Sequence, residues 1–473
     1  MSLPRKQETA MASVSTVLVL LLLCSCCHSL VAHAGNGERH KVLELNSKAV
    51  CSERNAIPSS SGGTTVPLNH RHGPCSPVPS GKKRPTHEEL LKRDQLRAEH
   101  IQRKFSRNAA AVDGAGELQQ SKASVPTKLG SSLDTLEYVI SVKLGSPGVT
   151  QTVSIDTGSD VSWVQCNPCP APPCHAQADP LFDPAASSTY AAFSCGAAEC
   201  AQLEQQGNGC GANSECQYGV QYGDGSTTNG TYSHDTLTLS GADVVKSFQF
   251  GCSHTESGFS DQTDGLMGLG GGAQSLVSQT AAKYGNSFSY CLPPTSDSSG
   301  FLTLGGPSGG ASGFVTTRML RSRRVPTFYG ARLQDIAVGG KQLGLPPSVF
   351  AAGSVVDSGT IITRLPQTAY SALSSAFRAG MKQYRSAPPR SILDTCFDFT
   401  GQTNISIPTV ELVFSGGATV DLDANGIMFG SCLAFTSTGD DRTTGIIGNV
   451  QQRTFEVLYD VGNSVLGFRS GAC

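Results

Sequence analysis

The chain has few charged residues and almost no tryptophan. Only 15% of its 473 residues are Asp, Glu, Lys or Arg, and it has one Trp, whereas Gly and Pro number 53 and 25. This composition suits an all-β protein rich in turns and excludes intrinsic disorder for most of the chain. Because 473 residues exceed what one hydrophobic core can organise, the sequence predicts two or three structural units.

Long apolar segments are also lacking. The apolar run Val14 to Leu23 falls short of the roughly 20 residues that a membrane helix needs. It follows Arg5 and Lys6 and precedes Ala32-His33-Ala34, which is the order of a secretory signal peptide. We predict a signal peptide over residues 1–34, secretion to the extracellular space (the apoplast) and no membrane association. A vacuolar or plastid location is the weaker alternative.

Charge is distributed unevenly along the chain. Residues 35–128 carry 16 Lys+Arg against 9 Asp+Glu, a net of +7, and residues 129–473 carry 17 against 27, a net of −10. Within this basic leader, Thr86 and Glu89 form the capping pattern of a helix start. An incomplete apolar stripe among basic residues follows. The helix is therefore either solvated or lies across an acidic groove, and residues 109–124 suit a cleavable linker.

Cysteine use fits an exported protein. Of 17 Cys, three lie in the signal and two in the leader, which leaves 12 in the body, an even number that indicates a disulfide framework. The alternative is a zinc site at Cys166, Cys169 and Cys174-His175, whose spacing is roughly zinc-like. An oxidising compartment favours disulfides, so we predict no metal and place His175 at the surface.

Two matching turns carry the chemistry. The segments SIDTGSDVSW (154–163) and SVVDSGT (354–360) each place an Asp after a short apolar strand, and Asp156 and Asp357 are 201 residues apart. If they face each other, two like charges at about 4 Å repel by roughly 4 kcal/mol at an effective dielectric of about 20, so they share one proton. Such a pair can activate water to cleave an amide with no cofactor, metal or covalent intermediate.

The residues beside each Asp have matching roles. Gly158 and Gly359 allow a close backbone approach and offer N–H donors, while Thr157 and Ser358 supply hydroxyls that could brace the two loops. Glycosidases also use paired carboxylates, but they do not require matching turns.

Taken together, five motifs resemble those of one family. In chain order they are SIDTGSDVSW, VQYGDGS, DGLMGLG, VVDSGT and GIIGNVQQRTFEVLYD. From about Tyr138 onward the chain is similar to the pepsin-type aspartic proteases, and the 12-Cys body and the leader stretch LNHRHGPCSP indicate the plant nepenthesin-like branch.

The resemblance implies an all-β bilobal fold with a few surface helices and an active-site cleft between the lobes. It implies a propeptide over 35–124, an N-terminal lobe over 125–310 with a cysteine-rich insert, and a C-terminal lobe over 311–473. Polypeptides are the implied substrates and pepstatin-type compounds the implied inhibitors of a monomer with no nucleic-acid partner. The implied site residues are the catalytic Asp156 and Asp357, the supporting Thr157, Gly158, Ser159, Ser358, Gly359 and Thr360, and the flap residues Tyr222, Gly223 and Trp163.

The resemblance also implies six disulfides in the body. They are Cys166–Cys169, Cys174–Cys252, Cys195–Cys216, Cys200–Cys210, Cys291–Cys473 and Cys396–Cys432. Asn229 and Asn404 begin glycosylation sequons.

Three functions remain in competition. The first is a secreted acid endopeptidase made as a zymogen, whose basic leader covers the cleft at neutral pH. The second is a xylanase-inhibitor-like binding protein on the same fold, although such proteins generally lack part of the catalytic set. The third is DNA binding in plastids, which the acidic body disfavours.

Overall fold

The structure is a computed structural model, and the residues it describes are 39–44, 64–70, 75–77, 86–110, 138–169, 172, 174–241, 243–259, 262–293, 299–306, 311 and 313–472. All of these except Arg39 belong to one compact unit, His40–Cys473. The predicted signal peptide lies outside the described residues. So does the predicted linker, apart from its first two residues, which end a helix.

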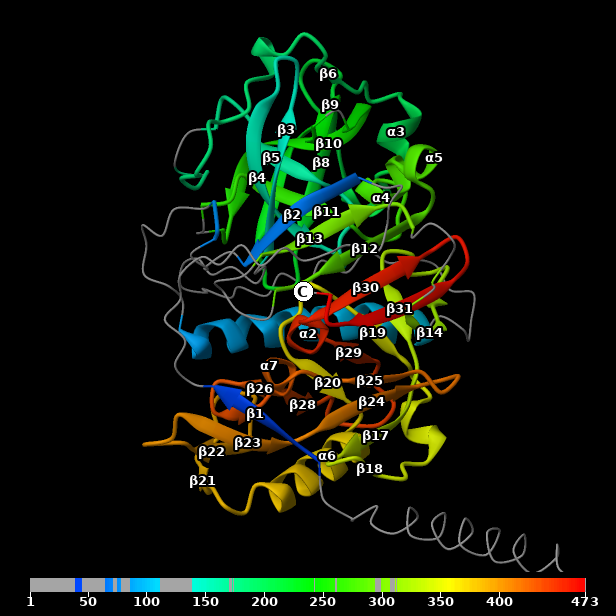
Figure 1. Cartoon of the computed structure of the whole chain (residues 1–473). Helices are drawn as coiled ribbons and strands as arrows, with labels where there is room; N and C mark the ends of the chain where they lie inside the picture. The colour runs from blue at the N-terminus through cyan, green and yellow to red at the C-terminus, as the bar shows by residue number, and fades with distance from the viewer. Residues whose placement is uncertain are drawn as a thin grey trace, which may run out of the picture. The chain divides into compact units, whose positions relative to one another are not determined.

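One large twisted sheet runs through the upper lobe and continues into the middle of the molecule (Figure 1). Its interior strands alternate or run continuously apolar, as strands buried on one or both faces require. In order across the sheet they are β14 (Val315–Arg318), β31 (Val465–Ser470), β30 (Phe455–Asp460), β12 (Ser287–Cys291), β13 (Ser299–Leu304), β2 (Thr64–His70), β3 (Tyr138–Leu144), β4 (Val149–Asp156), β11 (Gly265–Gly268), β5 (Trp163–Gln165), β10 (Asp243–Ser257), β9 (Thr227–Ser240), β8 (Cys216–Gln221) and β7 (Gly207–Cys210), with β6 (Ala191–Ala192) paired to β9.

The lower lobe consists of smaller sheets. The first holds β15 (Leu320–Arg321), β16 (Tyr329–Ala331), β19 (Ser354–Val356), β29 (Gly445–Ile447), β20 (Thr363–Leu365) and β28 (Phe435–Ser437). The second holds β18 (Lys341–Gln342), β17 (Leu333–Val338), β24 (Val410–Phe414) and β25 (Thr419–Asp421), and the third β21 (Arg385–Ala387), β22 (Cys396–Asp398), β27 (Cys432–Leu433) and β26 (Met428–Phe429). The expected all-β architecture in two lobes is therefore present.

The helices of the body are short, with one exception. The exception is α6 (Gln367–Gly380), which buries Ala369, Leu373 and Phe377 at helical spacing. Two short helices, α4 (Leu276–Gln279) and α5 (Ala281–Tyr284), follow each other directly, and at their junction the Thr280 hydroxyl donates to the Leu276 carbonyl oxygen at 2.7 Å. The others are α3 (Ala198–Ala201), α7 (Ala424–Ile427) and α8 (Asn449–Gln452), with 3₁₀ turns at Pro184–Ala186, Glu204–Gln206 and Pro347–Phe350.

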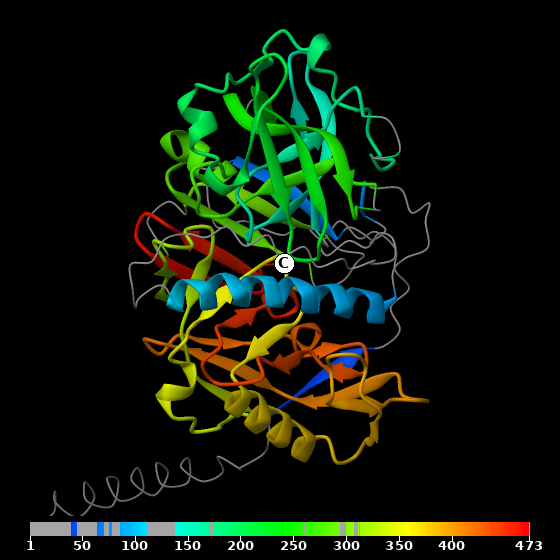
Figure 2. The same cartoon turned by 180° about the vertical axis from the view of Figure 1, so that it is seen from behind.

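Three elements of the leader are built into this body. Strand β1 (His40–Glu44) pairs with β23 (Asn404–Pro408) at the edge of the lower lobe, and β2 lies between β13 and β3 in the large sheet. Helix α2 (His87–Ala110) lies between the two lobes, as both views show (Figures 1 and 2). Its N-terminus is capped as predicted: the Glu89 N–H donates to the Thr86 hydroxyl at 3.2 Å and the Thr86 N–H to the Glu89 carboxylate at 2.7 Å.

Two predicted disulfides near the first turn are wrong. Cys166 pairs with Cys252, and Cys169 pairs with Cys174. The parallel pairing of β5 with β10 sets Val164 opposite Cys252, which brings the Cα atoms of Cys166 and Cys252 to 5.3 Å. Because these cysteines form disulfides, they do not offer thiolates to zinc.

The pairings in the insert are exchanged as well. Cys195 pairs with Cys210 and Cys200 with Cys216. Cys216 is fully buried, and α3 packs Cys200 against the same cluster, whereas Cys210 lies on the exposed strand β7 within reach of Cys195.

The remaining disulfide predictions concern cysteines in the C-terminal half of the sequence. The predicted pair Cys396–Cys432 is confirmed. Cys291 is disulfide-bonded, but Cys473 lies outside the described residues.

His175 is not at the surface, contrary to the sequence-based expectation. Its side chain is 7% exposed and contacts the Glu256 carboxylate at 2.6 Å and the Thr263 carbonyl oxygen at 2.8 Å. These partners are 81 and 88 residues away in the sequence, so the residues near His175 give no sign of them.

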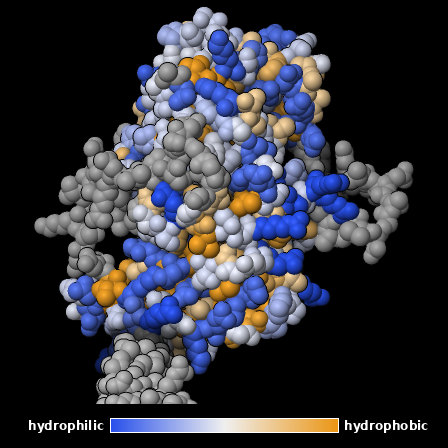
Figure 3. Space-filling view, turned by 45° about the vertical axis from the view of Figure 1, so that its right-hand side comes forward, coloured by the Kyte–Doolittle hydropathy of each residue, from blue (hydrophilic) through white to orange (hydrophobic). Residues whose placement is uncertain are grey.

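The surface of the described residues is largely hydrophilic. On the face in Figure 3, hydrophobic residues are scattered among hydrophilic ones, and the exposed large hydrophobic residues are Val42 and Val315. The sequon residue Asn404 is exposed, whereas Asn229 is half-buried within β9. In the part of the chain that the structure describes, no helix is both long and apolar enough to cross a membrane.

Candidate active site

The two aspartates occupy equivalent positions in the two lobes. Strand β4 ends at Asp156 beside the parallel strand β11, and β19 ends just before Asp357 beside the parallel strand β29. The Leu269 N–H donates to the Asp156 carbonyl oxygen at 2.8 Å, and the Asp357 N–H to the Ile447 carbonyl oxygen at 3.1 Å. Both carboxylates are fully buried, so each is fixed at the end of a rigid apolar strand.

The hydroxyl residues beside the aspartates connect the two loops. The Thr157 N–H donates to the Ser358 hydroxyl at 3.1 Å, and the Ser358 N–H donates to the Thr157 hydroxyl at 2.9 Å. All of these groups are buried, where such bonds are shielded from water. The reciprocal pair holds the two carboxyl-bearing loops in one relative position.

The neighbouring glycines supply donors and space. The Gly158 N–H donates to Asp156 Oδ1 at 2.9 Å, and the Gly359 N–H to Asp357 Oδ1 at 3.3 Å. A Cβ at Gly158 would lie 2.8 Å from an Asp357 oxygen, and one at Gly359 equally close to an Asp156 oxygen. Any larger residue at either position would therefore separate the two carboxylates.

The third residue after each aspartate, Ser159 or Thr360, makes different hydrogen bonds in the two lobes. The Thr360 hydroxyl donates to Asp357 Oδ2 at 2.5 Å. The Ser159 hydroxyl has no hydrogen-bond partner among the described residues, and its backbone carbonyl instead accepts from Gly270 at 2.9 Å. Only Asp357 therefore receives a side-chain hydroxyl from its own turn.

A residue that was not predicted to be part of the site contacts both aspartates. Arg97 of α2 is buried, with Nη2 2.6 Å from Asp156 Oδ1 and 2.9 Å from Asp357 Oδ1, and Nε 2.8 Å from Asp357 Oδ2. Its guanidinium fills the space above Gly158 and Gly359, where a Cβ would lie 2.4 Å from Nη2. One planar cation thus bridges the two lobes through both carboxylates.

The contact changes the titration of these groups. Burial raises the pKa of the Asp357 carboxyl, but the Arg97 guanidinium lowers it by more than burial raises it. The pKa of Asp357 therefore lies below its ordinary value. Burial likewise lowers the pKa of Arg97, and the two carboxylates raise it to well above its ordinary value. Both partners are therefore held in their charged forms at neutral pH.

The predicted flap lies against Arg97, which contacts both aspartates. Tyr222 and Ser226 close the turn between β8 and β9 through a 2.8 Å backbone hydrogen bond, and Gly225 takes a positive φ of 93° in that turn. The Tyr222 hydroxyl accepts from the Trp163 indole N–H at 2.7 Å, and both residues are buried. The flap is thereby tied to β5, the strand that follows the first aspartate turn.

Helix α2 also packs against the flap. A Cβ at Gly223 would lie 2.9 Å from the Arg97 Cα and 3.0 Å from the His100 Cβ, so only glycine allows the flap to close this far onto the helix. Beside it, burial lowers the pKa of Arg93 to about 9, opposed by Asp224 and Glu89. The Arg93 guanidinium has no hydrogen-bond partner among the described residues.

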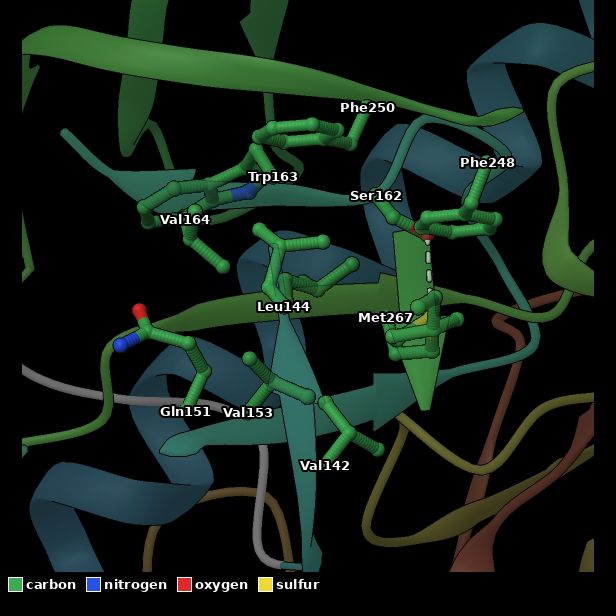
Figure 4. A pocket seen from close by; sticks show the side chains of 12 residues that line it. Val142, Leu144, Gln151, Val153, Ser162, Trp163, Val164, Phe248, Phe250 and Met267 are labelled. Atoms are coloured by element: carbon green, nitrogen blue, oxygen red, sulfur yellow. Dashed lines mark hydrogen bonds between the residues drawn. The ribbon is translucent and has the colours of Figure 1, made fainter. Parts of the chain in front are cut away.

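An apolar pocket lies within the upper lobe behind Trp163 (Figure 4). Its one drawn polar contact is between the Ser162 hydroxyl and the Met267 sulfur at 3.3 Å. The lining contains neither aspartate, so this pocket is part of the lobe's core. It is lined by Val142, Leu144, Gln151, Val153, Ser162, Trp163, Val164, Leu237, Phe248, Phe250, Leu266 and Met267.

A second charged residue of α2 is buried in the lower lobe. Asp94, one turn before Arg97, is bound by the Arg364 guanidinium at 2.7 Å, and both side chains are at most 2% exposed. This pair was not predicted from the sequence. The available signal was position: Asp94 and Arg97 fall at helical spacing within the apolar stripe of Leu90, Ala98 and Ile101, where charge is unexpected.

A bilobal β-fold with two buried aspartates on paired loops, one from each lobe, defines the class of pepsin-like aspartic proteases. Comparison with known families and proteins agrees with this class. The models described as xylanase inhibitor N-terminal and C-terminal domains match residues 138–306 and 328–470.

Relatives with known names are similar over nearly the whole chain. An aspartyl protease family protein and the aspartyl protease AED1, both of Arabidopsis thaliana, are 38% and 37% identical, each over 96% of this chain and 98% of its own. Aspartic proteinase nepenthesin-2 of Nepenthes gracilis is 34% identical over 84% of this chain and 88% of its own. The chain therefore belongs to the nepenthesin-like branch of the plant aspartic proteases, and it is an aspartic-type endopeptidase.

Solved structures add the fold. Soybean basic 7S globulin is 21% identical and aligns with a TM-score of 0.56 over 71% of this chain and 91% of its own. Lupine conglutin gamma is 18% identical and aligns with a TM-score of 0.57 over 72% of this chain and 93% of its own. At these identities the likeness shows the shared fold alone.

Proposed function

We propose that the protein is a secreted, monomeric aspartic endopeptidase made as a zymogen, in which α2 keeps the Asp156/Asp357 pair inactive. The observation that carries this proposal is the Arg97 guanidinium, which binds both carboxylates at 2.6 to 2.9 Å. While it is bound, neither carboxylate can take a proton from a water molecule.

The chemistry follows from the pair once the helix has left. Two buried carboxylates on opposing loops share one proton, because both cannot remain charged at close range. The charged one takes a proton from water, whose oxygen attacks the peptide carbonyl carbon while the neutral one donates to the carbonyl oxygen. Proton transfer to the amide nitrogen then allows the C–N bond to break. The N–H groups of Gly158 and Gly359 and the Thr360 hydroxyl keep the carboxylates in place.

Two features support the role of the leader. Helix α2 carries its cation at the position where substrate has to enter, and the flap residue Gly223 packs directly on the helix. The leader is also net positive and the body net negative, so attraction between them weakens as carboxylates are protonated. We therefore propose that acid releases α2, after which the leader is cut within residues 109–128.

The test uses the full-length chain in three forms: wild type, Asp156→Asn and, as a matched control, Asp398→Asn, whose carboxyl is exposed. Each is moved from neutral pH to about pH 4, near the ordinary pKa of Asp, and hydrolysis of a denatured protein is followed with and without pepstatin. We expect pepstatin-sensitive activity and a new N-terminus in the wild type and the control, and neither in Asp156→Asn. A folded wild type without activity would support the inhibitor-like binding function instead. Equal cleavage of all three forms would contradict self-activation.

A further inference from the structure

The carboxylate of Asp94 occupies a site that belongs to the body. Its Oδ2 accepts from Arg364 Nη1 at 2.7 Å and from the Ile362 N–H at 3.1 Å, and its Oδ1 accepts from the Ile361 N–H. Two successive backbone amides and a guanidinium thus surround one buried carboxylate. Backbone N–H groups in sequence and a charged fork of donors are the arrangement with which proteins bind anions.

Arg364 Nη2 donates to Gln95 Oε1 of α2 at 3.4 Å, but contacts within the body also hold the donors of this site. Arg364 lies in β20 and pairs with Ile446 of β29, and its Nη1 also donates to the Ile362 carbonyl oxygen at 2.6 Å. Its buried Nε has no hydrogen-bond partner among the described residues, so the guanidinium retains an unused donor. When α2 leaves, the cation and the two amides therefore remain as an anion site without its ligand.

The site is close to the reacting groups. Asp94 and Arg97 are three residues apart on α2, which corresponds to about 4.5 Å along the helix axis at about 1.5 Å per residue. An extended peptide advances by about 3.3 Å per residue, so this separation equals one to two residues of a bound substrate. The donors also come from the segment that follows Asp357 directly.

We propose that Arg364 and the N–H groups of Ile361 and Ile362 form a substrate subsite for a carboxylate side chain near the cut bond, a subsite that Asp94 fills in the latent form. The proposal rests on the proposed function of the Asp156/Asp357 pair. It assigns the enzyme a substrate class: polypeptides with Asp or Glu within about two residues of the scissile bond. The alternative is that Arg364 only anchors the leader, in which case the substrate's charge has no effect.

The experiment compares peptide substrates that differ only in Asp or Asn at one position, scanned over three residues on each side of the cut bond. The acid-activated enzyme is assayed at about pH 4.5, where a substrate Asp is mostly ionised. We expect kcat/KM for the Asp peptide to exceed that for the Asn peptide about tenfold at one position and to differ little at the others, a ratio in the range of single charge-assisted contacts.

Two variants identify the groups responsible. In Asp94→Asn/Arg364→Gln, the paired substitution avoids leaving one buried charge without its partner in the latent form. In this variant, kcat/KM for the Asp peptide should about equal that for the Asn peptide. In the control Arg385→Gln, whose side chain is exposed on β21, the Asp peptide should keep its advantage of about tenfold. A ratio near one in the wild type, or an unchanged ratio in the double variant, would overturn the subsite.

Failure of the proposed function gives a different result. If no peptide is cleaved, the subsite is measured by binding instead, with the same labelled peptides. The full chain is cut at two introduced protease sites, one between β2 and α2 and one between α2 and β3, so that α2 can leave while β2 stays in the large sheet. Preferential binding of the Asp peptide that depends on Arg364 supports the subsite without catalysis. Equal binding of the Asp and Asn peptides overturns it.

Discussion

Replacing Arg97 with glutamine should detach α2 from the aspartates. The side chain is 6% exposed and makes three charge-assisted contacts of 2.6 to 2.9 Å, all of which would be lost. Removing one partner of a buried ion pair costs about 3–5 kcal/mol, and the lower end applies here because the two remaining carboxylates can share a proton. At about 1.4 kcal/mol per factor of ten, about 3 kcal/mol corresponds to roughly a 150-fold increase in the open population.

Native-state hydrogen exchange measures this opening without any need for catalysis. The amide protection factors of α2 at neutral pH should fall roughly 150-fold in Arg97→Gln, provided the helix opens as a local unit. The control is Arg103→Gln on the same helix, whose exposed side chain contacts Glu99 at 3.6 Å. An exposed pair of this kind contributes about 0–1 kcal/mol, so its protection should change less than about fivefold. Equal protection in Arg97→Gln, Arg103→Gln and the wild type would refute the reasoning.

The same measurement has a defined pH dependence. The pKa of Asp357 is lowered in the docked state, so its titration stabilises docking above the ordinary pKa and this stabilisation is lost as pH falls toward the lowered value. Burial raises the pKa of Asp94, opposed by Arg364 and the amides of Ile361 and Ile362, so its titration favours docking as pH falls. The contribution of Asp357 should be lost in Arg97→Gln, where the opposing contribution of Asp94 remains, so acid should weaken the docking of α2 less in this variant than in the wild type.

Two further predictions concern the flap and the surface. Tyr222→Phe should lower the free energy of unfolding by about 1–3 kcal/mol in urea titrations, because it leaves the buried Trp163 N–H without its hydrogen-bond acceptor. The control Tyr284→Phe, at a half-buried position, should lower it less. Equal losses in the two variants would argue against the hydrogen bond that connects the flap to β5. Asn404→Gln should reduce the glycosidase-sensitive mass shift of the secreted protein by the mass of one glycan, because Asn404 is exposed and Asn229 begins the other predicted sequon; an unchanged shift would exclude glycosylation at Asn404.

Local signals in the sequence predicted much of the fold. Alternating apolar residues mark the strand Tyr138–Leu144, and the duplicated turns identify Asp156 and Asp357 as partners. The cap between Thr86 and Glu89 was also readable, because its hydrogen bonds join residues three apart. Each of these features depends on neighbours along the chain.

Features that depend on distant strands were not predictable in the same way. Cys166 pairs with Cys252 rather than Cys169 because of the register between β5 and β10, which the spacing of cysteines does not specify. The basic helix was predicted, but not that Arg97 would be its contact with the aspartates. Which residue of α2 contacts the aspartates depends on which face of the helix packs against the lobes.

Strand β2 gives the leader a part in the large sheet in addition to the latency that we propose for α2. It pairs with β13 over six residues and with β3 over two, and it buries Val66 and Leu68. A chain without residues 64–70 would present two unpaired strand edges and lack two core side chains. Maturation that removed this strand would therefore be a one-way step: the processed enzyme would persist because it unfolds slowly and would not regain the same sheet after denaturation.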